Sequence, residues 1–256
     1  MEHTALITGA TAGFGEATAR HFLAHGHQVI ALGRRVERLE ALKASLPVDQ
    51  QEKLLILVAD VCDSKTVDEL AATLPSPFSR VTILVNNAGL ALGLEPAHKA
   101  SISDWDRMID TNVKGLVHMT RAFLPAMVER KLGHVINVGS VAGSYAYPGS
   151  NVYGATKAFV RQFSLNLRAD LIGTPIRVTC IEPGLSSGTE YSNVRFKGDD
   201  TKAEKVYEGV KALSAEDIAE AIYWSSTLPP HVNINVLELM PVQQSFAGTT
   251  LYRGEL

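Results

Sequence analysis

Two side chains with complementary chemistry, Tyr153 and Lys157, are four residues apart. On a helix this spacing brings both to one face. A free tyrosine has a pKa of about 10 and exchanges protons poorly at neutral pH. An ammonium about 4 Å away attracts a phenolate by roughly 4 kcal/mol at an effective dielectric of about 20, which is about three pKa units before desolvation is subtracted. The pair predicts an acid–base tyrosine, although the same spacing also occurs on solvated helix faces.

Two further polar residues complete a candidate catalytic set. Ser140 directly follows an apolar run at residues 134–138, where its hydroxyl can donate to a substrate oxygen held near Tyr153. Asn112 lies inside a predicted helix, where asparagine is slightly unfavourable. We expect it to hold a water that relays protons to Lys157.

Glycines cluster after the first apolar run, with the spacing G-x-x-x-G-x-G from Gly9 to Gly15. A glycine turn between a strand and a helix lets the chain approach a pyrophosphate, and the helix N-terminus offers free N–H groups to it. A glycine turn without a ligand is the weaker alternative. The residues expected to contact a dinucleotide are Gly9, Thr11, Ala12, Gly13, Phe14 and Gly15.

The second apolar run ends in Arg34 and Arg35, where an NAD enzyme would place an acid for the ribose 2′-hydroxyl. Two guanidiniums suit a 2′-phosphate by bidentate hydrogen bonding, so the sequence favours NADP(H). The alternative is a solvated basic helix start, which the helix dipole disfavours.

Later loops supply further expected cofactor contacts. Residues after the third run can reach the adenine, and small residues after the fourth let chain and cofactor pass closely. Lys157 can also bind the nicotinamide ribose. These residues are Asp60, Val61, Asn87, Ala88 and Gly89, together with Tyr153 and Lys157.

The elements that must position these side chains alternate along the chain. Short apolar runs without strict alternation are typical of strands covered on both faces, and amphipathic stretches between them predict helices. This order predicts an α/β fold with a parallel sheet. The expected strands are 5–8, 29–32, 54–59, 81–85, 134–138, 176–181 and 234–239. The expected helices are 14–24, 36–45, 64–74, 103–129, 153–171 and 215–228.

The combined motifs resemble the short-chain dehydrogenase/reductase family over nearly the whole chain. Pro183 and Gly184, after the sixth run, also fit and are expected to border the cofactor. The resemblance implies one doubly wound Rossmann-type domain over residues 1–256, with a seven-stranded parallel sheet and helices on both faces. It implies Tyr153 as general acid–base, Ser140 as substrate-positioning donor, Lys157 as tuner of the tyrosine and Asn112 as relay. It also implies a homotetramer.

A narrower resemblance is to the NADP-dependent 3-hydroxy acid dehydrogenases, a subgroup that includes serine or allo-threonine dehydrogenases and malonic semialdehyde reductases. It implies substrates with a carboxylate and a 3-hydroxyl, such as serine or 3-hydroxypropionate. A buried carboxylate needs a cationic partner. Residues 184–209 are polar and predict an irregular lid or a surface loop. From this segment we expect Arg195, with Lys197 as the weaker candidate, to bind the carboxylate.

Composition excludes several other classes of protein. A net charge of −3 in 256 residues gives no reason to expect a nucleic-acid partner, and no apolar run has the length of a membrane span. Two distant cysteines favour a reduced, cytoplasmic compartment. Histidines near the N-terminus lack carboxylates or cysteines at ligand spacing, so no metal site is expected.

Two rival functions remain open at this point. One keeps the hydride chemistry and NADPH but acts on another carbonyl class, a ketoacyl thioester or a cyclic ketone. The other is a non-catalytic NADP-binding module, which would be expected to lack the tyrosine, the serine or the lysine. All three are present as Tyr153, Ser140 and Lys157.

Overall fold

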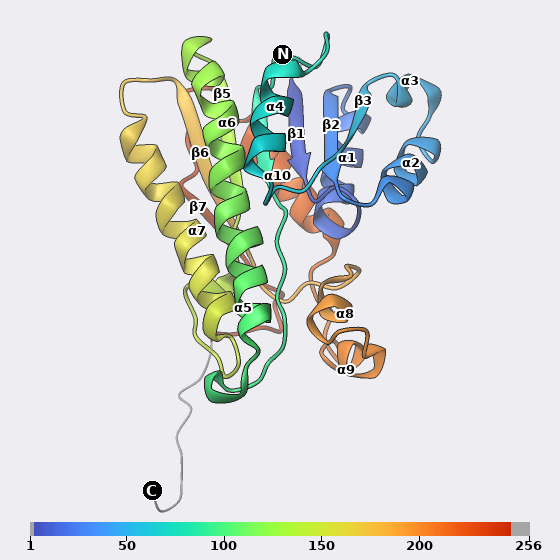
Figure 1. Cartoon of the computed structure of the whole chain (residues 1–256), viewed down its shortest axis with the longest axis vertical. Helices are drawn as coiled ribbons and strands as arrows, with labels where there is room; N and C mark the ends of the chain where they lie inside the picture. Colours follow the sequence, from blue (N-terminus) through green and yellow to red (C-terminus); the bar gives the residue numbers. More distant parts are fainter. Residues whose placement is uncertain (1–2, 247–256) are drawn as a thin grey trace, which may run out of the picture.

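A single seven-stranded sheet forms the centre of the molecule, and every strand is parallel to its neighbours (Figure 1). The computed structural model describes residues 3–246. The order across the sheet is β3-β2-β1-β4-β5-β6-β7, which confirms the predicted doubly wound topology. The strands are β1 Thr4–Thr8, β2 Gln28–Gly33, β3 Leu54–Val58, β4 Ile83–Asn86, β5 Gly133–Val138, β6 Ile176–Pro183 and β7 Val236–Leu239.

Helices cover both faces of this sheet, as predicted, and they bury two separate apolar clusters. One cluster packs α1, α2 and α10 against the sheet, and the other packs α4, α6 and α7 against the opposite face. Because each strand is covered twice, its residues are apolar in unbroken runs. The α-helices are α1 Gly13–Ala24, α2 Val36–Ala44, α3 Val48–Gln51, α4 Ser64–Thr73, α5 Ile102–Ile109, α6 Leu116–Glu129, α7 Asn151–Asp170, α8 Tyr191–Arg195, α9 Asp200–Lys205 and α10 Ala215–Thr227.

The strand order reverses between β1 and β4, and ligands of open α/β sheets bind where the carboxyl ends of the strands flank such a reversal. In Figure 1 those ends point downward, toward the side on which α8 and α9 lie. The fold therefore gathers the glycine loop, the loop after β4, the start of α7 and residues 184–209 at one edge of the sheet.

The predicted helix over 103–129 is interrupted. α5 and α6 are joined by a π-helical segment, Asp110–Gly115, in which hydrogen bonds span one residue more than in an α-helix. Asn112 lies in this segment and is buried. A π-turn inside a helix frequently marks a functional site, and no periodicity in the sequence distinguishes it from an α-helix.

Residues 184–209 are only in part the irregular segment expected from their polarity. They contain the short helices α8 and α9, and Asp199 caps α9 by accepting from the Lys202 N–H at 3.1 Å. The segment is also attached to the body of the protein, because the Gly93 N–H donates to the Arg195 carbonyl at 3.0 Å. The sequence did not predict α8 and α9, because five- and six-residue helices are too short to show a hydrophobic period. The rest of the segment is irregular, as its polarity suggested.

Two histidines lie at the far edge of the sheet, away from the strands' carboxyl ends. Burial, then the neighbouring Arg177 and His3, holds the pKa of His134 well below its usual value. Burial, then the neighbouring His27, lowers the pKa of His3 to about 4. His134 Nε2 lies 2.8 Å from Thr179 Oγ1, so the neutral ring keeps a hydrogen bond.

We therefore expect the folded state to lose stability as pH falls below about 6.5, the unperturbed value for histidine. Below this pH the histidines of the unfolded chain bind protons, whereas the buried histidines of the folded protein stay neutral, down to about pH 4 for His3. Urea unfolding midpoints between pH 7 and pH 4.5 measure this. His134→Gln should flatten the profile, whereas His231→Gln, at an exposed position, should leave its slope unchanged. An unaltered slope in the His134 variant would contradict this assignment.

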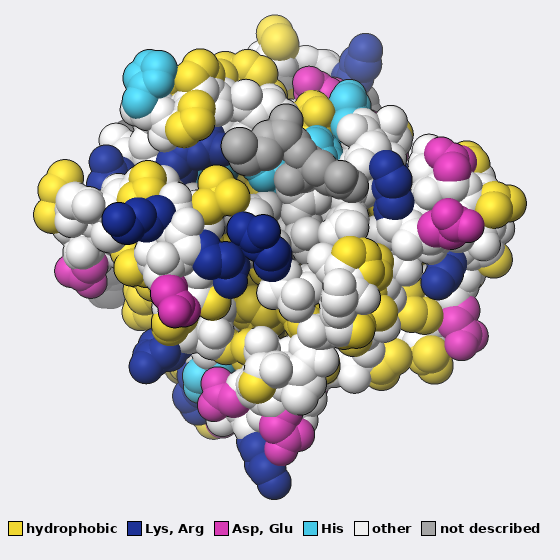
Figure 2. All heavy atoms as spheres, turned by 90° about the horizontal axis from the view of Figure 1, so that it is seen from above, with side chains coloured by type: hydrophobic (Ala, Val, Ile, Leu, Met, Phe, Trp, Pro, Cys, Tyr) yellow, Lys and Arg dark blue, Asp and Glu magenta, His cyan; other side chains and the backbone are white. Residues whose placement is uncertain are grey.

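Within residues 3–246, no helix is long and apolar enough to cross a bilayer. Figure 2 views the molecule from above, at the end opposite α8 and α9, and shows side chains of both charge signs on this face.

Candidate active site

The predicted Ser140 and Tyr153 meet at the carboxyl end of β5. Ser140 follows that strand, and Tyr153 lies in the first turn of α7, 7% exposed. Their side chains share a hydrogen bond, and the Tyr153 hydroxyl also bonds the side chain of Tyr191. Ser140 Oγ accepts from the Ala142 N–H at 3.1 Å, which fixes the hydroxyl beside the phenol.

Burial raises the pKa of Tyr153, and this effect outweighs its hydrogen bonds from Tyr191 and Ser140 and the attraction of Arg195. This differs from the sequence-based expectation, in which the Lys157 ammonium lowers that pKa. Lys157 Nζ lies 5.9 Å from the centre of the Tyr153 ring. Proton release by this phenol therefore depends on the surrounding cations and on what binds beside it.

Lys157 projects from α7 into the interior, where it is 6% exposed. Burial lowers the pKa of its ammonium to about 8. Nζ donates to the Val138 carbonyl at 2.8 Å, and a Cβ added at Gly89 would lie 3.4 Å from it. The amine therefore sits between α7 and the loop after β4, and it is mainly protonated at neutral pH.

The side chain of Asn112 is held by the protein on three sides. Its Oδ1 accepts from the Leu90 N–H at 2.8 Å, and its Nδ2 donates to the Leu90 carbonyl at 2.9 Å and to Thr156 Oγ1 at 3.0 Å. The amide thus ties the loop after β4 to α7 in front of Lys157. This bracketing was not expected from the sequence, which suggested only a water relay.

Arg195 reaches the site from α8 and is 9% exposed. Its Nε donates to the Gly93 carbonyl at 3.2 Å and its Nη1 donates to the Tyr147 hydroxyl at 3.1 Å. The guanidinium carbon lies 5.7 Å from the centre of the Tyr153 ring. Its Nη2 is buried and has no hydrogen-bond partner among the residues that the structure describes. A buried donor of this kind is costly unless a ligand pairs with it.

Lys197, the weaker candidate, lies elsewhere. Its ammonium pairs with Asp104 at 2.8 Å and its side chain is 62% exposed. Two tyrosines that the sequence did not single out, Tyr147 and Tyr191, instead surround Arg195 and Tyr153. Tyr147 lies four residues before α7 and Tyr191 lies far along the chain, and neither stands at a spacing from Tyr153 that indicates a shared site.

The glycine loop has the shape that a dinucleotide requires. Gly9 and Gly13 adopt positive φ, and a Cβ on Gly15 would lie 2.3 Å from the Gly9 carbonyl oxygen. No side chain caps the N-terminus of α1, because Ala12 occupies that position. The first-turn N–H groups beside Thr11 and Phe14 are thus left for phosphate oxygens, so the residues present fit NADP(H).

The two arginines after β2 point in different directions. Arg34 Nη1 lies 3.3 Å from Asp60. Arg35 donates from Nη2 to Thr11 Oγ1 at 2.9 Å, and its Nη1 pairs with Glu190 at 2.8 Å. Arg35 thus contacts the glycine loop, whereas Arg34 contacts the residue that follows β3 by two positions.

The remaining predicted cofactor residues lie at the same edge of the sheet. The N–H groups of Asn87 and Ala88 donate to Thr8 Oγ1 at 3.0 and 2.9 Å, which joins the loops after β1 and β4. Val61 packs against the π segment, where a Cβ on Gly115 would lie 2.6 Å from Val61 Cγ2. After Pro183, the N–H of Gly184 donates to the Leu239 carbonyl at 2.7 Å and holds the start of residues 184–209.

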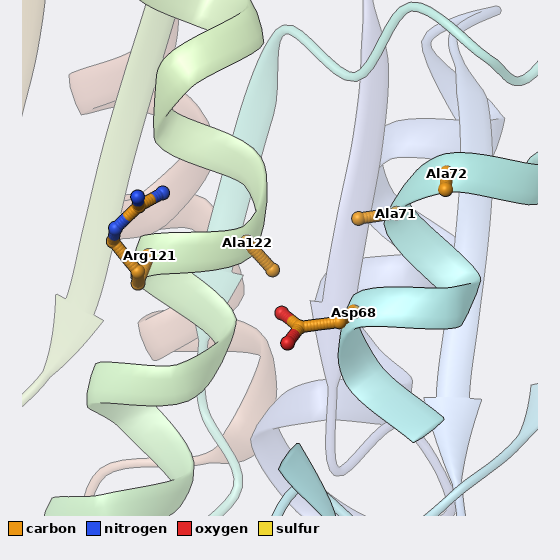
Figure 3. Close-up of a pocket in the computed structure, with 5 residues that line it drawn as sticks. All are labelled: Asp68, Ala71, Ala72, Arg121 and Ala122. Atoms are coloured by element: carbon orange, nitrogen blue, oxygen red, sulfur yellow. The ribbon is translucent and has the colours of Figure 1, made fainter. Parts of the chain in front are cut away.

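A surface hollow lies apart from the predicted site, between α4 and α6 (Figure 3). Asp68 points from α4 toward Ala122 of α6, whereas Arg121 points away from it. None of its lining residues belongs to the predicted site, and its walls carry no acid–base pair. Among residues 3–246 no group of histidine, cysteine and acidic side chains is arranged to hold a metal ion.

Comparison with known proteins agrees with this geometry. The family model described as short chain dehydrogenase matches residues 3–200. The chain belongs to the short chain dehydrogenase family. It is 63% identical over 248 residues to the NADP-dependent 3-hydroxy acid dehydrogenase YdfG of Escherichia coli K12, an alignment that covers 97% of this chain and 98% of the relative.

Two further relatives are similar over their full length. The serine 3-dehydrogenase of Agrobacterium fabrum is 51% identical over 253 residues, 99% of each chain. The structure of the closed form of serine dehydrogenase complexed with NADP+ superposes with a TM-score of 0.95 at 62% identity, covering 98% of this chain and all of that one. The identified family confirms the resemblance inferred from the sequence motifs.

Proposed function

We propose that the protein is an NADP-dependent oxidoreductase that interconverts a small 3-hydroxy acid, of the serine, allo-threonine or 3-hydroxypropionate type, and its 3-oxo form. The observation that carries this proposal is the buried Arg195, whose unpaired Nη2 lies beside the phenol of Tyr153. An acid–base group near a buried guanidinium with one unpaired nitrogen suits a substrate with a hydroxyl and a carboxylate a few bonds apart. The similarity to a 3-hydroxy acid dehydrogenase and to a serine 3-dehydrogenase supports the same substrate class.

In this mechanism Tyr153 removes the proton of the substrate hydroxyl. Ser140, bonded to the phenol, donates to the substrate oxygen and holds it in place. For oxidation the phenol first gives up its own proton toward Lys157 and the water relay. Arg195 and Lys157 then stabilise the phenolate that accepts the substrate proton. Lys157 exchanges its proton with water through a relay beside Asn112, which keeps the loop after β4 aligned with α7.

The glycine loop and the α1 N-terminus are assigned to the pyrophosphate of NADP(H), with Arg34 and Arg35 assigned to its 2′-phosphate. Asp60 and Val61 border the adenine, and Lys157 also holds the nicotinamide ribose. When bound, the nicotinamide supplies the hydride acceptor for oxidation and the hydride donor for reduction. The other residues assigned to the cofactor are Gly9, Thr11, Ala12, Gly13, Phe14, Gly15, Asn87, Ala88, Gly89, Tyr153, Pro183 and Gly184.

Residues 184–209 are assigned the role of a lid that carries Arg195 to the substrate carboxylate. The lid excludes water from the phenol, so the charge interactions inside are strengthened. Gly188 and Gly209, both at positive φ, flank α8 and α9 and give the chain freedom to move there.

We also assign the protein to the cytoplasm as a homotetramer. Both cysteines among the described residues, Cys62 and Cys180, are free thiols, as suits a reducing compartment. Apolar side chains on α5 and α7 are exposed in the single chain, including Ile102 at 64% and Phe159 at 38%. Association would bury them, and sedimentation equilibrium at four times the chain mass tests this.

The proposed function is tested by an absorbance assay at the NADPH band with a panel of substrates. We expect serine and 3-hydroxypropionate to be oxidised with NADP+ at kcat/KM at least 100-fold above the value with NAD+, because a guanidinium pair recognises the 2′-phosphate. Ketoacyl thioesters and cyclic ketones serve as the comparison class with NADPH. Faster turnover of these ketones than of every 3-oxo acid would overturn the substrate assignment.

A further inference from the structure

Two guanidiniums of the coenzyme side converge on a single carboxylate. Glu190 Oε2 lies 2.8 Å from Arg35 Nη1, and Glu190 Oε1 lies 3.1 Å from Arg38 Nη2. Arg35 is the N-cap residue of α2, without a capping side-chain hydrogen bond, and Arg38 lies three residues on, so both reach the same side of that helix. Two guanidiniums on one oxyanion form the arrangement that recognises a phosphate. In this structure an internal carboxylate occupies it.

Glu190 belongs to a run of three residues that contact three parts of the site. Thr189 covers the glycine loop, since a Cβ on Gly13 would lie 3.0 Å from its Cβ. Tyr191 bonds the phenol of Tyr153. Glu190, between them, is the N-cap residue of α8, but its side chain makes no capping hydrogen bond. Its carboxylate pairs with the two arginines instead.

We propose that Glu190 is the resident anion of the 2′-phosphate subsite and that the 2′-phosphate of NADP(H) displaces it. The inference rests on the proposed NADP dependence and adds Arg38 to that subsite. A phosphate monoester carries nearly two negative charges at neutral pH, so it repels a carboxylate held between the same guanidiniums. A coenzyme without this phosphate leaves the ion pairs in place.

Displacement of Glu190 also reaches the substrate side of the site. Because Glu190 immediately precedes α8, releasing it frees the start of the helix that carries Tyr191 and Arg195. Binding of the 2′-phosphate at one end of the coenzyme thereby increases the mobility of the residues around Tyr153. Glu190 acts here as a positioning and specificity residue, with no contact to the reacting atoms.

The test compares 2′,5′-ADP, which carries the 2′-phosphate, with 5′-AMP, which lacks it. Calorimetry with the wild-type protein and with Glu190→Gln gives the dissociation constant of each nucleotide. We expect the substitution to lower the dissociation constant of 2′,5′-ADP about five-fold, because it removes a competing anion that forms two exposed ion pairs. The dissociation constant of 5′-AMP should change less than about two-fold. Unchanged or weaker binding of 2′,5′-ADP would overturn the proposal.

Glu37→Gln is the matched control. Glu37 lies in the first turn of α2, carries the same charge and forms no ion pair with Arg35 or Arg38 within the described residues. If Glu37→Gln lowered the dissociation constant of 2′,5′-ADP equally, the effect would come from net charge alone, and the proposal would also be overturned.

A second readout follows the lid itself. Hydrogen exchange in residues 189–197 of the wild-type protein should increase with 2′,5′-ADP and not with 5′-AMP. Protection of this segment by 2′,5′-ADP would contradict displacement. If the wild-type protein binds 2′,5′-ADP no better than 5′-AMP, the NADP assignment itself fails; if it prefers 2′,5′-ADP and Glu190→Gln has no effect, only this inference fails.

Discussion

Replacing Tyr153 by Phe is expected to lower kcat for 3-hydroxy acid oxidation by roughly 10³-fold. The phenol is the group that shares a hydrogen bond with Ser140 and is assigned to remove the substrate proton. Its ring would remain, so packing around the site should change little. Stopped-flow or steady-state absorbance at the NADPH band measures the loss, and NADPH fluorescence titration should show that coenzyme binding is retained.

Tyr191→Phe is the matched control for this experiment. Tyr191 is a second tyrosine whose side chain bonds that of Tyr153, and burial raises its pKa well above the usual value. We expect this variant to keep more than about a tenth of kcat, because its hydroxyl is assigned no proton transfer. A profile in which Tyr191→Phe is inactive and Tyr153→Phe is active would reverse the assignment of the acid–base group.

Replacing Arg195 by Met should raise KM for serine and 3-hydroxypropionate about 100-fold while changing KM for neutral alcohols of the same length less than about three-fold. The guanidinium is buried and offers an unpaired Nη2 next to Tyr153. Truncating one partner of a buried charge pair costs roughly 2–5 kcal/mol, which sets the size of the effect. Steady-state kinetics on both substrate classes provides the comparison.

Lys197→Met controls for the loss of one positive charge from the same segment. Lys197 is 62% exposed and pairs with Asp104, so its replacement should leave KM within about two-fold. Equal losses on charged and neutral substrates in the Arg195 variant would show that Arg195 only supports the lid. A KM effect confined to Lys197→Met would move the carboxylate clamp to that residue.

The sequence predicted the sheet and the positions of Ser140 and Tyr153 because both depend on short-range patterns. Apolar runs mark strands buried on both faces, and chemistry collects where those strands end. The four-residue spacing of Tyr153 and Lys157 places both side chains on one face of a helix, independently of the packing around that helix. These features needed no knowledge of distant contacts.

Features that depend on distant contacts were not predictable in the same way. The pKa of Tyr153 is set by how deeply α7 is covered, and burial outweighed the attraction that spacing alone suggested. The contact of Arg195 with Tyr147 and that of Glu190 with Arg35 follow from how residues 184–209 fold back on the sheet. Two short helices there bury few apolar residues, so the sequence carried little trace of them.

The π segment Asp110–Gly115 has a consequence for how this chain can vary. One surplus residue in a helix turns everything before it by roughly 100° relative to everything after it, unless a wide turn absorbs the difference locally. Deletion of a single residue near Asn112 would therefore join α5 and α6 into a more regular α-helix. It would also break the hydrogen bonds of Asn112 with Leu90 and Thr156. Selection for thermal stability alone would therefore remove the π-helical turn, whereas selection for catalytic turnover would keep it.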